Sequence, residues 1–155
     1  MTKSKAVIGL LLAAVAAGAL AVASSAENAR SSPRSGELHV TKECGSYSGL
    51  AGQHCTITSS SLPAIKRGSK VVYASAAGDP IRGQLNSDLV IDGPGNNDAY
   101  GHVVLDLATF TGTVTLSGGT GEFRRFNARV AVTPLGWPNF AWDGTYTFGR
   151  SDDDD

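Results

Sequence analysis

The chain has 155 residues, enough for one ordinary domain, and its 13 basic and 14 acidic residues leave a formal net charge of −1. A nearly neutral protein has no broad positive electrostatic field of the kind that binds nucleic acid without sequence preference. We therefore expect no nucleic-acid partner. Glycine accounts for 19 of the 155 residues, or about 12%, whereas its usual share is about 7%.

The first 26 residues have the pattern of a secretory signal peptide. Lys3 and Lys5 precede an apolar run from Ala6 to Ala23, and small residues up to Ala26 supply cleavage motifs. A positive start, an apolar middle and an A-x-A-like exit are typical of exported proteins. A retained anchor is the alternative, because a run of about 18 apolar residues can span a bilayer. We expect cleavage, a secreted or periplasmic location, and no membrane contact afterwards.

Polar segments flank the region that we expect to fold. Residues 27–36 are rich in serine and read as a flexible leader, and residues 150–155 form an acidic tail. The sequence therefore predicts one folded domain over residues 37–149.

Both cysteines lie in the expected domain. An exported chain meets an oxidising compartment, so Cys44 and Cys55 are predicted to form a disulfide. The bridge would close a loop of about a dozen residues and stabilise the fold by about 2–3 kcal/mol. His54 and Glu43 beside the cysteines allow a metal site as the alternative, but their spacing matches no common zinc pattern. We expect no metal and no cofactor.

The rest of the domain consists of short runs with period-two alternation, separated by glycine, proline, asparagine and aspartate. Eight such runs are predicted strands: 38–44, 55–61, 70–75, 84–91, 102–107, 112–117, 126–132 and 142–148. Dense turn signals lie at 92–98 and 117–121, and 134–140 reads as the last long loop. Eight strands without a helical pattern predict an all-β fold, an eight-stranded antiparallel β-barrel, with a β-sandwich as the alternative.

One segment resembles a known family. Gly112–Arg129 contains a strand, a Gly-Gly-Thr-Gly turn, an aromatic residue and an Ala-Arg pair that opens the next strand, and Trp142–Phe148 looks like a closing barrel strand. This pattern resembles the allene oxide cyclase and dirigent barrel families over residues 101–148. The resemblance implies an eight-stranded barrel, a bacterial secreted member of the superfamily, and association into homo-oligomers.

The resemblance also implies a function. Small eight-stranded barrels can hold one small ligand, and in these families the cavity binds and folds a hydrophobic substrate with few polar catalytic groups. That is catalysis by restricting conformation, as in a cofactor-free cyclase or isomerase. The residues expected to bind the ligand are Tyr73, Asp88, Phe126, Trp142, Tyr146 and Phe148. Glu43 and Asp106 are further candidate acids, the catalytic residues stay unknown, and the sequence leaves open whether a reaction occurs.

Two other functions remain open from the sequence. The loop Pro134–Phe140 and the basic cluster Lys66, Arg67 and Lys70 favour a non-enzymatic extracellular interaction or carbohydrate-binding module. A hydrolase has only scattered histidine, aspartate and serine residues in its favour, and their spacing forms no recognisable triad.

Overall fold

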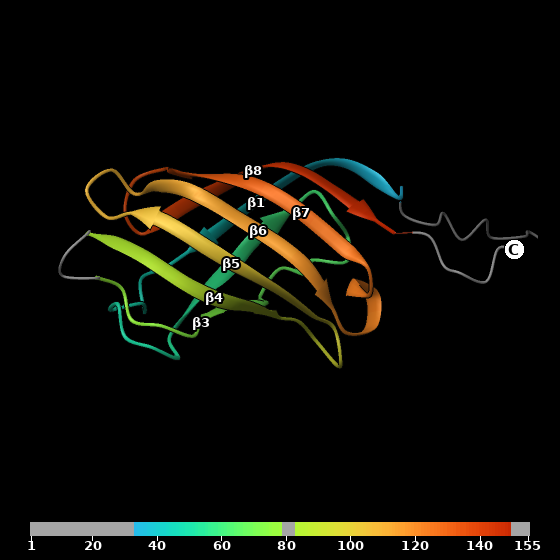
Figure 1. Cartoon of the computed structure of the whole chain (residues 1–155), viewed down its shortest axis with the longest axis horizontal. Coiled ribbons are helices and arrows are strands. Elements are labelled where there is room, and N and C mark those ends of the chain that lie inside the picture. The colour runs from blue at the N-terminus through green and yellow to red at the C-terminus, as the bar shows by residue number, and fades with distance from the viewer. Residues whose placement is uncertain (1–32, 79–82, 150–155) are drawn as a thin grey trace, which may run out of the picture. The chain divides into compact units, whose positions relative to one another are not determined.

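The computed structural model describes residues 33–78 and 83–149, which form a closed barrel of eight antiparallel strands. The strands follow one another around the barrel in chain order, and β8 pairs back onto β1 (Figure 1). Their bounds are β1 (Ser35–Glu43), β2 (His54–Ser60), β3 (Lys70–Tyr73), β4 (Gln84–Asp92), β5 (Asp98–Asp106), β6 (Thr111–Gly119), β7 (Phe126–Pro134) and β8 (Asn139–Phe148). A single 3-10 turn, η1 (Gly121–Phe123), lies between β6 and β7. The predicted barrel is thereby confirmed, and the sandwich alternative is not.

Closure depends on the pairing of the first and last strands. The β1–β8 ladder runs without a shift from Ser35 opposite Thr147 to Glu43 opposite Asn139. This pairing satisfies the backbone groups that an open sheet would leave free at its two edges. The part of the chain that the structure describes contains no helix capable of spanning a bilayer. The predicted signal peptide, leader residues 27–32 and the acidic tail lie outside the described residues.

Several strand ends differ from their predicted positions. β1 begins at Ser35, inside the predicted leader; β5 begins at Asp98 rather than at residue 102; and β7 and β8 extend into the predicted 134–140 loop. In each case a polar or proline-containing segment continues the strand because a neighbouring strand pairs with it, as Asp92 does with Asp98 and Pro134 with Phe140. Cross-strand pairing thus lengthens strands beyond their apolar runs.

Alternation along the strands fills the interior with apolar side chains. The largest of the fully buried ones are Trp142, Tyr73, Phe123, Phe126, Leu38, Ile57, Leu62, Leu89, Ile91 and Leu116.

Close approach of neighbouring strands requires glycine at some interior positions. A Cβ atom at Gly144 of β8 would overlap the backbone of Arg129 and Val130 on β7, so only glycine fits there.

The predicted disulfide is confirmed. Cys44 and Cys55 are bonded, 11 residues apart in sequence, and both side chains are buried. The bond fixes the connection between β1 and β2, which forms part of one end of the barrel. On the chain-entropy account, a loop of this size stabilises the fold by about 2–3 kcal/mol.

Candidate functional site

One end of the barrel contains a cavity of about 300 Å³. It lies where the connections β1–β2, β3–β4, β5–β6 and β7–β8 gather, and residues of all four contribute to it. Its wall is mainly apolar, including Leu85, Val103, Leu105, Leu107, Phe110, Val132, Trp137 and Phe140. A concave apolar site with a few polar groups is the usual form of a small-molecule site, and this volume is at the small end of the common range.

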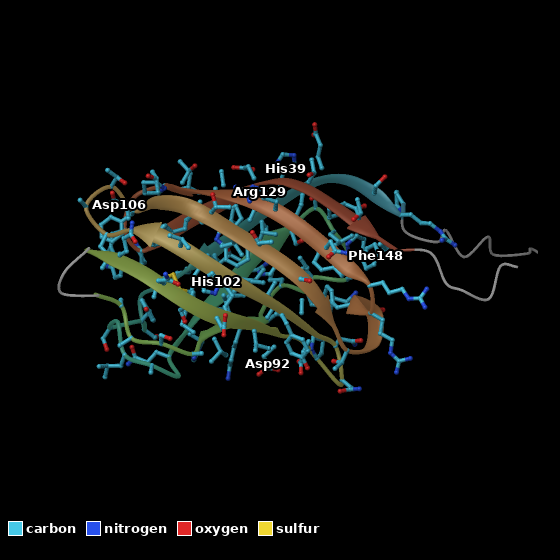
Figure 2. All side chains as sticks on the ribbon, in the orientation of Figure 1. His39, Asp92, His102, Asp106, Arg129 and Phe148 are labelled. Atoms are coloured by element: carbon cyan, nitrogen blue, oxygen red, sulfur yellow. A yellow bond between two sulfur atoms is a disulfide. The ribbon has the colours of Figure 1, made fainter. Side chains whose placement is uncertain are left out.

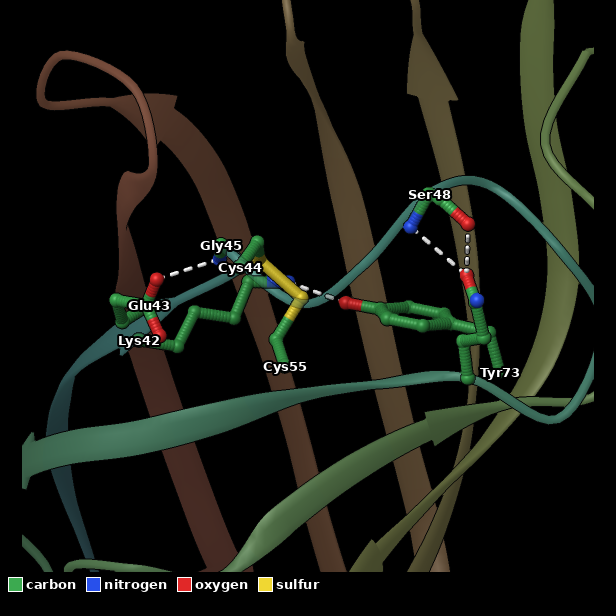
Figure 3. The surroundings of a disulfide bond; sticks show 8 residues. Lys42, Glu43, Cys44, Gly45, Ser48, Cys55 and Tyr73 are labelled. Carbon is green, nitrogen blue, oxygen red and sulfur yellow. Dashed lines mark hydrogen bonds between the residues drawn. A yellow bond between two sulfur atoms is a disulfide. The ribbon is translucent and has the colours of Figure 1, made fainter.

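The principal polar group in this cavity is Lys42 of β1. It points to the inside because it follows Leu38 and Val40 in the strand alternation, and only 6% of it is exposed. Its ammonium group donates a hydrogen bond to the hydroxyl oxygen of Tyr73 on β3 (Figure 3). No carboxylate among the described residues forms an ion pair with it.

Aromatic rings surround the Lys42 nitrogen. Nζ lies 4.8 Å from the ring centroid of Trp142 and 5.6 Å from that of Phe140. Both distances fall within the range in which a ring face attracts a cation. Nζ is also 5.1 Å from the Tyr73 centroid, but it meets this ring at its hydroxyl, so we regard that contact as a hydrogen bond rather than a cation–π contact.

Burial changes the acid–base properties of this pair. Loss of hydration disfavours the ammonium form and lowers the pKa of Lys42 to about 7. The faces of Trp142 and Phe140 favour the cation and oppose part of this effect. Burial also raises the pKa of Tyr73 well above its usual value, so its phenol stays neutral. Near neutral pH a substantial fraction of Lys42 is therefore a free amine beside a phenol that can donate a proton.

A second phenol lies against the same cavity. The ring of Tyr47 tilts against that of Tyr73, with 5.1 Å between the centroids. Its hydroxyl oxygen is buried and has no hydrogen-bond partner among the described residues, and burial raises its pKa. A buried hydroxyl without a partner is costly unless another group completes its hydrogen bond. A polar atom of a molecule in the cavity would provide such a group.

The residues predicted to bind a ligand do not all lie together. Tyr73 lines the cavity, and Trp142 lies against Lys42 beneath it. Phe126 and Tyr146 instead belong to a buried cluster of rings, with 6.3 Å between their centroids, that fills another part of the interior. Phe148 packs on Phe126 and lines a separate shallow hollow.

The predicted acidic groups lie elsewhere. Asp88 occupies an outward position on β4, its side chain is 83% exposed, and it accepts a hydrogen bond of 2.7 Å from Nδ1 of His102 on the outer face, where Figure 2 labels His102. The expectation that Asp88 lines the interior is therefore wrong, because its neighbours in the alternation, Ser87 and Leu89, point inward. Glu43 and Asp106 accept hydrogen bonds from the backbone in their own connections and do not line the cavity either.

Sequence reasoning missed Lys42. The signal was present, since Lys42 shares its strand parity with Leu38, Val40 and Cys44, all of which are buried. It was overlooked because lysine is almost always exposed, and a lysine near a strand end ordinarily reaches solvent. Only barrel closure, which brings β3 and β8 around β1, shows that Tyr73, Phe140 and Trp142 enclose this side chain.

The structure gives less support to a metal site or to a binding surface outside the cavity. Within the described ranges, no three histidine, cysteine, aspartate or glutamate side chains gather as they would around a metal ion. On the loop between β7 and β8, Trp137 is 65% exposed, whereas Phe140 is buried under it. Lys66, Arg67 and Lys70 are exposed at the opposite end from the cavity, where β2 and β3 are connected.

Comparison with known proteins identifies no relative: no family model, no curated protein and no solved structure matches this chain. The resemblance to the allene oxide cyclase and dirigent families therefore stays a prediction, while the eight-stranded barrel is established from the structure itself.

Proposed function

We propose that this protein is a secreted small barrel that binds a small, mainly hydrophobic molecule in the cavity at the end of the barrel. The observation that carries the proposal is the combination of an apolar wall with the buried Lys42–Tyr73 pair. A buried amine destabilises a fold unless it is neutral or well paired. Lys42 costs stability at this position in the cavity wall, and this cost favours a binding role for it.

The polar groups suggest how the molecule is oriented. Lys42, Tyr47 and Tyr73 all line one cavity whose remaining wall is mostly hydrocarbon. A ligand with an apolar body and one oxygen atom would bury the body against the wall and direct the oxygen at these three groups. In small-molecule sites, apolar contacts usually provide the affinity and a few polar contacts fix the orientation of the ligand.

Secretion is supported by the disulfide and by the signal-peptide pattern of residues 1–26. A bond between Cys44 and Cys55 forms and persists in oxidising compartments and is compatible with an extracellular location. Whether the cavity also performs a cyclase or isomerase reaction depends on the bound molecule. The neutral Tyr73 phenol and the Lys42 amine would be the acid and base available for it.

Filling the cavity is expected to weaken binding. The side chain of Val103 points into the cavity, whereas that of Val104, the next residue of β5, is 40% exposed on the outer face. We expect Val103→Phe to weaken binding of 3-phenylpropanol and related apolar alcohols by about tenfold or more, and Val104→Phe to leave it unchanged. The measurement is a fluorescence titration that follows Trp137 and Trp142. If wild type shows no response to a broad panel of apolar molecules, the proposal fails.

A second function is favoured by one observation. Trp137 and Leu135 are 65% and 57% exposed on the loop between β7 and β8, and an exposed tryptophan is common in binding surfaces. If this loop binds a carbohydrate, Trp137→Ala will abolish glycan binding, whereas Val103→Phe and Tyr100→Ala, an exposed aromatic of the outer face, will not. A glycan array with no ligand for wild type would remove this alternative.

A further inference from the structure

We infer that Lys42 is a nucleophile that forms a covalent imine with an apolar aldehyde or ketone bound in the barrel cavity. The inference rests on the proposed function, because the carbonyl compound must first occupy the same cavity. It goes further by naming the chemical class of the ligand and the atom to which it is attached.

The surroundings of Lys42 favour a carbonyl over other ligands. A lysine that serves as a cation is ordinarily matched to a carboxylate, yet Lys42 has one hydrogen-bond partner among the described residues, the neutral Tyr73. An amine without a counter-ion in an apolar cavity is the environment in which lysines act as nucleophiles on carbonyl compounds. Burial, which lowers the pKa of Lys42 to about 7, leaves a large part of it unprotonated at neutral pH.

The neighbouring residues can carry the necessary proton transfers. The Nζ lone pair attacks the carbonyl carbon, a C–N bond forms, and the C=O π electrons move to oxygen. Tyr73, hydrogen bonded to Nζ, donates its phenol proton to that oxygen and regains a proton from the nitrogen. Loss of the oxygen as one molecule of water, with both amine hydrogens, then leaves the C=N bond. No electrons are gained or lost, so no oxidant or reductant is needed.

The site also suits the product. An imine that takes up a proton is a cation at the position that the Lys42 ammonium occupied, 4.8 Å from the Trp142 centroid and 5.6 Å from that of Phe140. The two ring faces stabilise such a cation without a counter-ion. The apolar wall limits access of the water that would hydrolyse the C=N bond.

Reductive trapping tests the inference on the folded, oxidised protein. We expect 3-phenylpropanal with sodium cyanoborohydride at pH 7 to attach one phenylpropyl group to Lys42, as located by peptide mass spectrometry. The exposed Lys66 and Lys70 are internal controls within the same molecule. An ordinary lysine, with a pKa of 10.5, has under about one in a thousand of its molecules unprotonated at pH 7, so Lys42 should react at least about tenfold faster. Equal rates at all three lysines would overturn the inference.

Variants separate the roles of the residues. Lys42→Arg should remove the product at this position. Tyr73→Phe, which keeps the ring and removes the proton donor, should slow trapping by about tenfold. Val103→Phe should also suppress trapping at Lys42, while Val104→Phe should not. Because the comparison with Lys66 and Lys70 is made in wild type, a variant that fails to fold does not decide the result.

The saturated alcohol distinguishes failure of this inference from failure of the proposed function. 3-Phenylpropanol has the shape of the aldehyde but cannot form an imine. If wild type binds the alcohol and the aldehyde reversibly and no adduct forms at Lys42, the cavity is a ligand site and the covalent step is refuted. If wild type binds neither compound, the proposed function fails for this class of ligand, and the inference fails with it.

Discussion

The free energy of unfolding is expected to rise with pH between about pH 7 and pH 10. In the folded barrel the pKa of Lys42 is lowered to about 7 by burial, whereas in the unfolded chain it returns to its ordinary value of 10.5. Between these values the unfolded state binds one more proton than the folded state, so stability increases by up to about 1.4 kcal/mol per pH unit. Over the whole window this amounts to at most about 5 kcal/mol, since the ring faces around Nζ favour the cation and reduce the shift.

Urea unfolding of the oxidised protein at intervals from pH 6 to pH 9.5 measures this slope. The comparison is Lys42→Met, which should flatten the dependence, with Lys70→Met as an exposed control that should keep it. The absolute stability of Lys42→Met is less informative, because the substitution also leaves the Tyr73 hydroxyl without its partner. Equal slopes in wild type and Lys42→Met would show that Lys42 stays protonated in the fold.

Three other groups limit the pH range of this experiment. The exposed His39 has its pKa raised by hydrogen bonding to Asp143 and then to Glu37, so its contribution to stability is complete at acid pH and is lost as the pH rises through the folded pKa. Wild type and both variants share this effect, which therefore cancels in their difference. Burial raises the pKa of Tyr73 and that of Tyr47, so ionisation of these phenols in the unfolded chain removes stability above about pH 10.

Removal of the Trp142 side chain is expected to have the largest effect of any single truncation. Trp142 is 0% exposed, and its strand neighbours are Val40 on β1 and Val132 on β7. Its side chain therefore packs inside the barrel at the place where β8 pairs with β1 and closes the sheet. Trp142→Ala should lower the free energy of unfolding by about 3–5 kcal/mol, as large-to-small substitutions in a core do. Trp142→Phe should cost clearly less, because the indole N–H has no hydrogen-bond partner among the described residues.

The same pair of variants reports on Lys42. The space left by Trp142→Ala admits water beside Nζ, so the pKa of Lys42 should move back toward its ordinary value and the pH dependence of stability should weaken. Trp142→Phe keeps a ring face against Nζ and should retain that dependence. Equilibrium unfolding at pH 7 and pH 9 measures both effects. A Trp142→Ala protein with wild-type stability would contradict the packing role assigned to this residue.

The strands of the barrel could be predicted from local residue patterns. Alternation in segments such as 126–132 and 84–91 placed apolar side chains on one face, and that pattern requires an extended strand with one buried side. The pairing of Cys44 with Cys55 was equally local, because these are the two cysteines of the chain. The alternation of apolar and polar residues and the presence of two cysteines can be read from the sequence directly. Both could therefore be used without knowing how the strands pair.

The candidate site could not be inferred in this way. Whether Tyr73, Phe126 or Tyr146 lines a cavity or fills the core depends on which end of the barrel each residue reaches, and strand parity is the same at both ends. The environment of Lys42 likewise arises from residues on β3 and β8 that lie 31 to 100 positions further along the chain. Only closure of the tertiary structure brings them together around the amine, and the same closure excludes water and so changes its chemistry.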